Sequence, residues 1–131
     1  MGTRALVYVY SDDDTPRPLV CMYYQYDGYP SGLGAELAKF LQPIDIINGI
    51  TPGDESGIVA NGMGCLAAQL IADQKQGVGG VYIVHCEPGS DHWQDFEYHI
   101  YKKRVDVKNP KNLMFSGSWA DFRDFCEEDD S

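Results

Sequence analysis

The sequence predicts a single α+β domain with a mainly antiparallel sheet of four to six strands and about three helices. Short stretches rich in β-branched and aromatic residues occur in pairs joined by turns, which is typical of β-hairpins. Two stretches with helical spacing of apolar residues lie together between these pairs. The 131 residues, 44% of them hydrophobic, are enough for one core.

Residues 3–10 and 19–26 are expected to form the first hairpin. Residues 11–18 connect them and contain three acids and two prolines, so they indicate a turn. Both strands are apolar at almost every position. We therefore expect both faces of this part of the sheet to be covered.

The helical pair follows this hairpin. A glycine- and proline-rich turn at 27–34 precedes apolar residues at positions 33, 37, 40 and 41, and Pro43 ends this first helix. Residues 44–50 are expected to be a short helix or a buried connection, and 51–57 a loop. An apolar stripe at positions 66, 67, 70 and 71 predicts a second helix over 65–76 that stops at Gly77.

The C-terminal half returns to strands. We expect a strand at 81–86, a polar loop at 87–94 and a half-exposed strand at 95–102, in which Glu97, His99 and Tyr101 occupy the outer face. Residues 103–108 continue that strand or form another, and 113–115 form a short one. Ser118 is the predicted N-cap of a last helix. The order is β-β-α-α-β-β-(β)-β-α, with a domain at 1–126 and a flexible acidic tail at 127–131.

The charge balance excludes several partners. Twenty acids against ten bases give a net charge of −10, so we expect no basic patch that could bind duplex nucleic acid or an anionic membrane. No apolar run approaches the ~18 residues that a membrane-spanning helix needs, and the first residues do not resemble a secretory signal. The four cysteines form no C-x-x-C pair, which favours reduced thiols and a cytoplasmic protein: Cys21, Cys65, Cys86 and Cys126.

Two glycine-rich segments are the strongest candidates for a ligand site, because each directly precedes a predicted helix. A helix N-terminus exposes backbone N–H groups and the positive end of the helix dipole, which suits a phosphate or carboxylate. The candidate ligand-binding residues are Asp27, Gly28, Tyr29, Gly32, Gly34, Asn61, Gly62 and Gly64. Tyr23, Tyr24, Tyr26 and Tyr29 add rings that could stack on a base or sugar.

A structural explanation of the same glycines is that they supply positive φ angles for tight turns. Their spacing matches neither a Walker motif nor a dinucleotide fingerprint. If the two helices run in the same direction, the two segments meet in one concave site, and the long connection between the helices permits this. Asp27 and Asn61 are then the candidate capping residues.

Cys65 and His85 form the alternative, enzymatic candidate. Cys65 lies at a predicted helix start, where the dipole can lower the pKa of a thiol, and His85 lies on the following strand. Asp91, Asn61 or Gln69 could orient the imidazole. The arrangement resembles that of papain-like hydrolases, although no local signature of those enzymes is present. A buried, tightly packed helix start explains the same residues.

No cofactor or metal site is favoured. His85, Cys86, Asp91 and His92 have ligating side chains, but their spacing matches no tetrahedral motif, and His85 and Cys86 point to opposite faces of a strand. His99 is expected to be an ordinary cross-strand polar residue. The acidic runs at 12–14 and at the C-terminus are expected to be solvated charge, with the binding of a basic partner as an alternative.

Two motifs carry a family resemblance. The strings Tyr26-Asp27-Gly28-Tyr29-Pro30-x-Gly32-x-Gly34 and Asn61-Gly62-Met63-Gly64-Cys65-Leu66-Ala67-Ala68-Gln69-Leu70 resemble those of a family of small proteins from bacterial, phage, large-virus and marine invertebrate genomes, to which no activity is assigned. The resemblance spans the chain from the first strand to residues 115–118. It implies a stand-alone single domain with the glycine-rich segments as its most distinctive surface, and it transfers no catalytic residue.

We therefore interpret the chain as a small soluble intracellular binding module and not as an enzyme. Its expected ligand is a small anionic molecule such as a nucleotide, or else a segment of a protein partner. The alternative is a cysteine hydrolase or acyl-transfer enzyme that uses Cys65 and His85.

Overall fold

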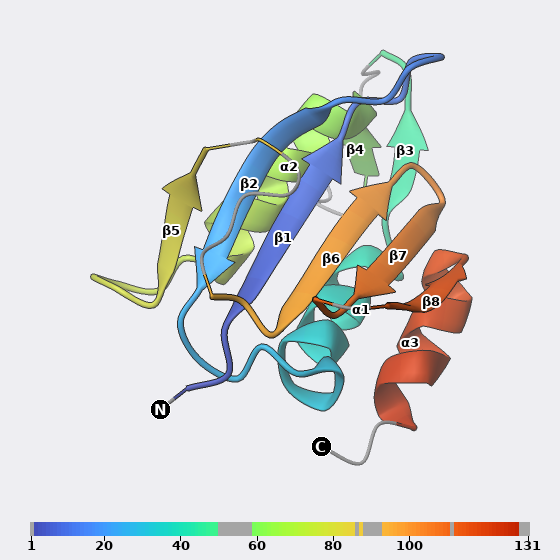
Figure 1. Cartoon of the computed structure of the whole chain (residues 1–131). Helices are drawn as coiled ribbons and strands as arrows, with labels where there is room; N and C mark the ends of the chain where they lie inside the picture. Colours follow the sequence, from blue (N-terminus) through green and yellow to red (C-terminus); the bar gives the residue numbers. More distant parts are fainter. Residues whose placement is uncertain (1, 50–58, 86, 88–92, 111, 129–131) are drawn as a thin grey trace.

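The computed structural model describes residues 2–49, 59–85, 87, 93–110 and 112–128. The predicted α+β class and element order are confirmed (Figure 1). The elements are β1 (Ala5–Tyr10), β2 (Pro18–Tyr24), the π-helical turn η1 (Pro30–Gly34), α1 (Ala35–Leu41), β3 (Asp45–Ile47), β4 (Val59–Asn61), α2 (Gly62–Gln74), β5 (Val81–Val84), β6 (Phe96–Tyr101), β7 (Arg104–Lys108), β8 (Leu113–Gly117) and α3 (Trp119–Glu127).

The main sheet has six strands in the order β5-β2-β1-β6-β7-β8. Four of its five strand pairs are antiparallel, as expected for strands joined by hairpins. The exception is the parallel pair β1–β6, which joins the N-terminal strands to the C-terminal ones, with Ala5 opposite Phe96 and Val9 opposite Ile100. The sheet is therefore mainly antiparallel, with one parallel pair at its centre.

β1 is the central buried strand, since all six of its residues are buried. Ala5, Val7 and Val9 belong to the main core, which the helices complete through residues such as Leu37, Leu66 and Phe122. Leu6, Tyr8 and Tyr10 form a second cluster with Cys21 on the opposite face. For β1, the expectation that both faces are covered is confirmed.

Two boundaries differ from the prediction. Residues 44–50 were expected to be a short helix or a buried connection, but Asp45–Ile47 forms β3, which pairs in parallel with β4 in a separate two-stranded sheet. The second helix begins at Gly62 and not at Cys65, so the second glycine-rich segment is the first turn of α2. Residues 51–57, predicted to be a loop, lie outside the described residues.

α3 closes the domain against α1 and η1. Its predicted N-cap is confirmed, because Ser118 Oγ accepts a hydrogen bond of 3.1 Å from the backbone N–H of Asp121. Glu127 is the last residue of this helix and not the start of a tail, and residues 129–131 lie outside the described part of the chain. None of the described helices has the length and apolar character needed to cross a membrane.

Tyr98 on β6 ties the sheet to the turn before η1, because its hydroxyl donates a buried hydrogen bond of 2.6 Å to the carbonyl of Gly28. We expect Tyr98→Phe to lower the free energy of unfolding by about 1–3 kcal/mol, because it removes the donor from a buried carbonyl. Urea denaturation measures this change. The control is Tyr82→Phe on β5, where the side chain is 45% exposed. Equal unfolding free energies for Tyr98→Phe and the unsubstituted protein would contradict the prediction.

Candidate ligand-binding site

The first glycine-rich segment is a compact turn that packs closely on its surroundings. The backbone N–H of Leu33 donates a hydrogen bond of 2.8 Å to the carbonyl of Asp27. A Cβ atom on Gly28 would lie 2.7 Å from the Cβ of Ala5, and one on Gly34 would lie 2.7 Å from the sulfur of Cys126. These glycines are therefore required by close packing and not by positive φ angles.

An open cavity of about 380 Å³ lies beside this turn. We call it the tyrosine pocket, and its lining residues are Tyr24, Tyr26, Asp27, Tyr29, Ser31, Gly32, Leu33, Ala35, Glu36, Gln74 and Val81. Three predicted ligand-binding residues, Asp27, Tyr29 and Gly32, are among them. Tyr24 is buried, whereas Tyr26 is 62% exposed. Tyr24, Tyr26 and Tyr29 thus lie beside this turn as expected, whereas Tyr23 packs against the cluster on the opposite face of the sheet.

The charges of the tyrosine pocket are negative. Asp27 and Glu36 are its only ionised lining side chains at neutral pH among the described residues. The C-terminal end of α2 also lies here, because Gln74 lines the pocket, and a helix C-terminus carries the negative end of the dipole. Lys75 follows α2, but its ammonium donates to the carbonyls of Gly79 and Val81 at 2.9 and 2.8 Å.

Tyr24 links the pocket to the last turn of α2. Its hydroxyl donates a hydrogen bond of 3.3 Å to Gln74 Oε1, and Gln74 Nε2 donates one of 2.7 Å to Asp73 Oδ2. Burial raises the pKa of the Tyr24 hydroxyl, and the negative charge of Asp73 raises it further. Tyr24 therefore stays neutral and remains a hydrogen-bond donor.

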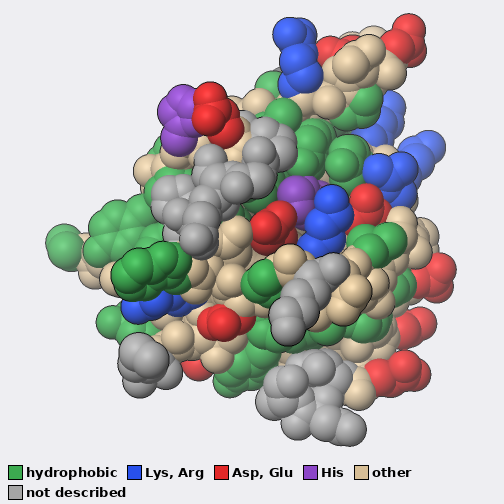
Figure 2. Space-filling view, viewed as in Figure 1, with side chains coloured by type: hydrophobic (Ala, Val, Ile, Leu, Met, Phe, Trp, Pro, Cys, Tyr) green, Lys and Arg blue, Asp and Glu red, His purple; other side chains and the backbone are tan. Residues whose placement is uncertain are grey.

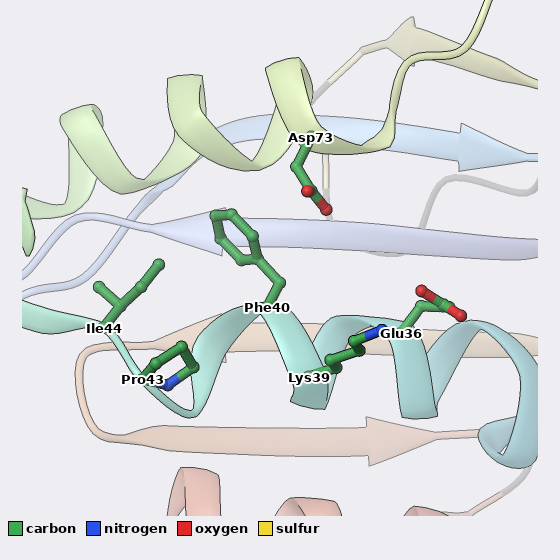
Figure 3. A pocket seen from close by; sticks show the side chains of 6 residues that line it. All are labelled: Glu36, Lys39, Phe40, Pro43, Ile44 and Asp73. Atoms are coloured by element: carbon green, nitrogen blue, oxygen red, sulfur yellow. The ribbon is translucent and has the colours of Figure 1, made fainter. Parts of the chain in front are cut away.

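A second hollow of about 340 Å³ lies between α1 and α2. We call it the interhelical groove, and it is lined by Glu36, Lys39, Phe40, Pro43, Ile44 and Asp73 (Figure 3). Glu36 lines both this groove and the tyrosine pocket. Sequence reasoning did not single out Glu36 or Asp73. The sequence did contain one signal for Asp73. An acid in the last turn of a helix is unfavourable beside the negative end of the helix dipole, and no basic residue in this turn offsets it.

The second glycine-rich segment lies at the other end of α2, so the predicted composite site is wrong. Gln74 lines the same cavity as Gly32, whereas Gly62 begins α2 twelve residues earlier, about 18 Å away along the helix at ~1.5 Å per residue. The physical reason is the parallel pairing of β3 with β4, which starts α2 at the far end of the domain (Figure 1). α1 and α2 therefore run in opposite directions.

Neither predicted capping residue caps a helix through its side chain, although Asn61 occupies the N-cap position of α2. Asn61 Oδ1 accepts a hydrogen bond of 2.8 Å from the backbone N–H of Gly49, and α2 has no side-chain cap. Asp27 Oδ1 accepts from the Tyr29 hydroxyl at 3.5 Å. A Cβ atom on Gly64 would meet nothing within 4 Å. The main physical reason to expect an anion, two converging helix N-termini, is thus lost.

Cys65 and His85 are not paired. The half-buried Cys65 packs against the main core, and its thiol donates to Gln69 Oε1 at 3.3 Å. The His85 side chain is 74% exposed and has Glu87 at 3.9 Å as its partner. No described histidine nitrogen lies within hydrogen-bonding distance of the Cys65 sulfur. Asn61, a candidate for orienting His85, bonds to Gly49 instead, and Asp91 lies outside the described residues.

The ligating side chains around residues 85–92 are only partly described. Cys86, Asp91 and His92 lie outside the described residues, and His85 is exposed. Within the described ranges, no three His, Cys, Asp or Glu side chains gather closely enough to hold a metal ion.

His99 is not the ordinary cross-strand residue that the sequence suggested, because it is buried and 4% exposed. Its ring stacks on Tyr8 at 4.6 Å, its Nδ1 lies 2.6 Å from the Tyr10 hydroxyl, and its Nε2 lies 2.9 Å from Glu97 Oε1. The parallel pairing of β1 with β6 brings the two tyrosines over the imidazole. In the sequence, the large residues Leu6, Tyr8 and Tyr10 alternate along β1, and this alternation was the signal that the face of the sheet bearing His99 is buried.

This cluster lies on the sheet face opposite the helices, and the face of the molecule seen in Figure 2 carries both acidic and basic side chains among apolar ones. Burial raises the pKa of the Tyr10 hydroxyl, and neighbouring Tyr101 raises it further. The hydrogen bond from His99 lowers the pKa of Glu97. None of these residues lines the tyrosine pocket. Tyr10, His99 and Glu97 therefore form a hydrogen-bonded network within the sheet.

Comparison with protein-family models, with curated proteins and with solved structures finds no match to this chain.

The lowered pKa of Glu97 makes stability depend on pH. Because folding lowers this pKa below 4.5, the carboxylate stabilises the fold above the unfolded-state pKa, and this contribution is lost as the pH falls through the folded-state value. We expect Glu97→Gln to make the free energy of unfolding less dependent on pH between about 5 and 3. Urea denaturation at a series of pH values measures the slopes. The control is Glu87→Gln, at a side chain that is 75% exposed, and an unchanged slope in Glu97→Gln would contradict the prediction.

Proposed function

We propose that this protein is a binding module whose ligand is a small organic cation held in the tyrosine pocket. The observation that carries the proposal is the chemistry of the lining, which combines Tyr24, Tyr26 and Tyr29 with the acids Asp27 and Glu36. The faces of aromatic rings attract cations, most strongly where water is displaced, and ammonium groups are recognised in this way. The volume of about 380 Å³ suits a small ligand.

A cation replaces the anion that the sequence favoured. The expectation of an anion depended on two helix N-termini that meet, whereas the pocket has the C-terminal end of α2 and two carboxylates. A nucleotide phosphate in this pocket would face Asp27 and Glu36 without a basic side chain to offset them. The net charge of −10 adds a general attraction for cations.

The binding module is proposed to work in the cytoplasm. Cys21, Cys65 and Cys126 form no disulfide bond, which supports a reducing compartment. The acidic composition supports partners other than duplex nucleic acid.

The test is isothermal titration with choline and with its neutral carbon isostere, 3,3-dimethylbutanol. The two probes have nearly the same shape, so the charge alone separates them. We expect choline to bind about five- to thirtyfold more tightly, because a partly desolvated cation–π contact contributes ~1–2 kcal/mol. Equal affinities, or tighter binding of ATP than of choline, would contradict the proposal.

Glu36→Gln tests the location of the cation. We expect it to weaken choline binding about fivefold, because one of the two lining carboxylates is lost, at about 1 kcal/mol for a partly exposed charge pair. Glu87→Gln is the matched control, since it removes the same charge from an exposed side chain that does not line the pocket. Equal weakening in both variants would place the cation elsewhere.

A further inference from the structure

We infer that the ligand carries a second ammonium group, held in the interhelical groove, so that its chemical class is a linear polyamine. The inference rests on the proposed function, because the first ammonium group occupies the tyrosine pocket. It adds a second point of recognition between α1 and α2.

The two cavities adjoin at Glu36 of α1. Glu36 lines both of them, and the neighbouring residues Asp73 and Gln74 of α2 line one each. From Glu36 the groove extends to Phe40, one helical turn or about 6 Å further at ~1.5 Å per residue, and on to Ile44. The short methylene segments of a polyamine bridge such a distance between successive ammonium groups.

The walls of the groove carry two carboxylates without basic partners. Asp73 comes from α2 and Glu36 from α1, and both side chains extend into the space between the helices (Figure 3). Within the described part of the chain, neither forms an ion pair. Gln74 Nε2 donates a hydrogen bond of 2.7 Å to Asp73 Oδ2, and Gln74 Oε1 accepts one from the Tyr24 hydroxyl. The Asp73 carboxylate is therefore oriented by the same residues that line the tyrosine pocket.

The floor of the groove suits methylene groups. The ring of Phe40 stands between the two helices, and Pro43 and Ile44 lie at the end of the groove (Figure 3). An aliphatic chain that lies over them buries apolar surface while its ammonium groups reach the acids at the walls. Alternation of methylene and ammonium groups matches this alternation of apolar and acidic lining.

A basic peptide fits the groove less well than a polyamine. The groove lies between two helices whose backbone groups are bonded within the helices, so the amides of an extended peptide would find no main-chain partners. A polyamine has no such groups to satisfy. Among the described residues, Lys39 is the single basic residue of the lining, and although it forms no ion pair with Glu36 or Asp73, we expect its ammonium group to compete with the ligand for them.

The experiment is isothermal titration of the full chain with n-butylamine, putrescine and spermidine at physiological ionic strength. We expect spermidine and putrescine to bind about tenfold more tightly than n-butylamine, as the charge-assisted hydrogen bonds of a second ammonium group allow. If choline binds but the diamines bind no more tightly than n-butylamine, this inference fails and the proposed function stands. If no cation binds, both fail.

Asp73→Asn separates the groove from the pocket. It keeps the oxygen that accepts from Gln74 and removes the charge of an exposed side chain, so the fold is expected to persist. We expect the spermidine to n-butylamine affinity ratio to fall to near one, with choline binding unchanged. Asp14→Asn, in the exposed β1–β2 turn, changes the net charge equally and is expected to keep the ratio. An unchanged ratio in Asp73→Asn would overturn the inference.

Lys39→Gln gives a test of opposite sign. Removal of the competing ammonium group leaves the two carboxylates to the ligand, so spermidine affinity is expected to rise about threefold while choline binding changes less. Weaker spermidine binding in this variant would contradict a cation site in the groove.

Discussion

The parallel pairing of β1 with β6 is the interaction on which the rest of the structure depends. It joins the N-terminal strands to the C-terminal ones and leaves β1 buried on both faces. On one face it sets His99 between Tyr8 and Glu97. On the other face, the next residue towards the N-terminus, Tyr98, holds the carbonyl of Gly28 and thereby the turn that borders the tyrosine pocket. One strand pair thus positions both polar features of the domain.

Local patterns predicted the elements well, because hairpin strands and amphipathic helices depend on short stretches of sequence. The direction of α2 depends instead on the pairing of β3 with β4, two strands of three residues each, separated by eleven residues of sequence. Strands this short have no periodicity to detect. The predicted composite site failed for this reason, because its two halves were assigned correctly to helix starts but were assumed to meet.

The candidate site was predictable in its aromatic part only. Tyr24, Tyr26 and Tyr29 are close in sequence, so their association with the glycine-rich turn followed from their positions. The charge of the site depends on contacts across the fold, because Glu36 and Asp73 come from two helices whose relative direction was not known. Three of the four expected rings were therefore placed correctly beside this turn, whereas the two carboxylates that favour our proposal of a cation were not foreseen. Burial of His99 was missed for the same reason, since it follows from a neighbour 89 residues away.

The close contact between Gly34 and Cys126 has a consequence for biosynthesis. The lining of the tyrosine pocket comes from positions 24–36, 74 and 81, all of which leave the ribosome before β6 and α3. The turn that shapes this lining rests on Tyr98 of β6 and on the sulfur of Cys126 in α3. An emerging chain therefore has the rings and carboxylates well before it has the support that fixes their geometry. The geometry of this turn is thus completed only when the last helix of the domain docks.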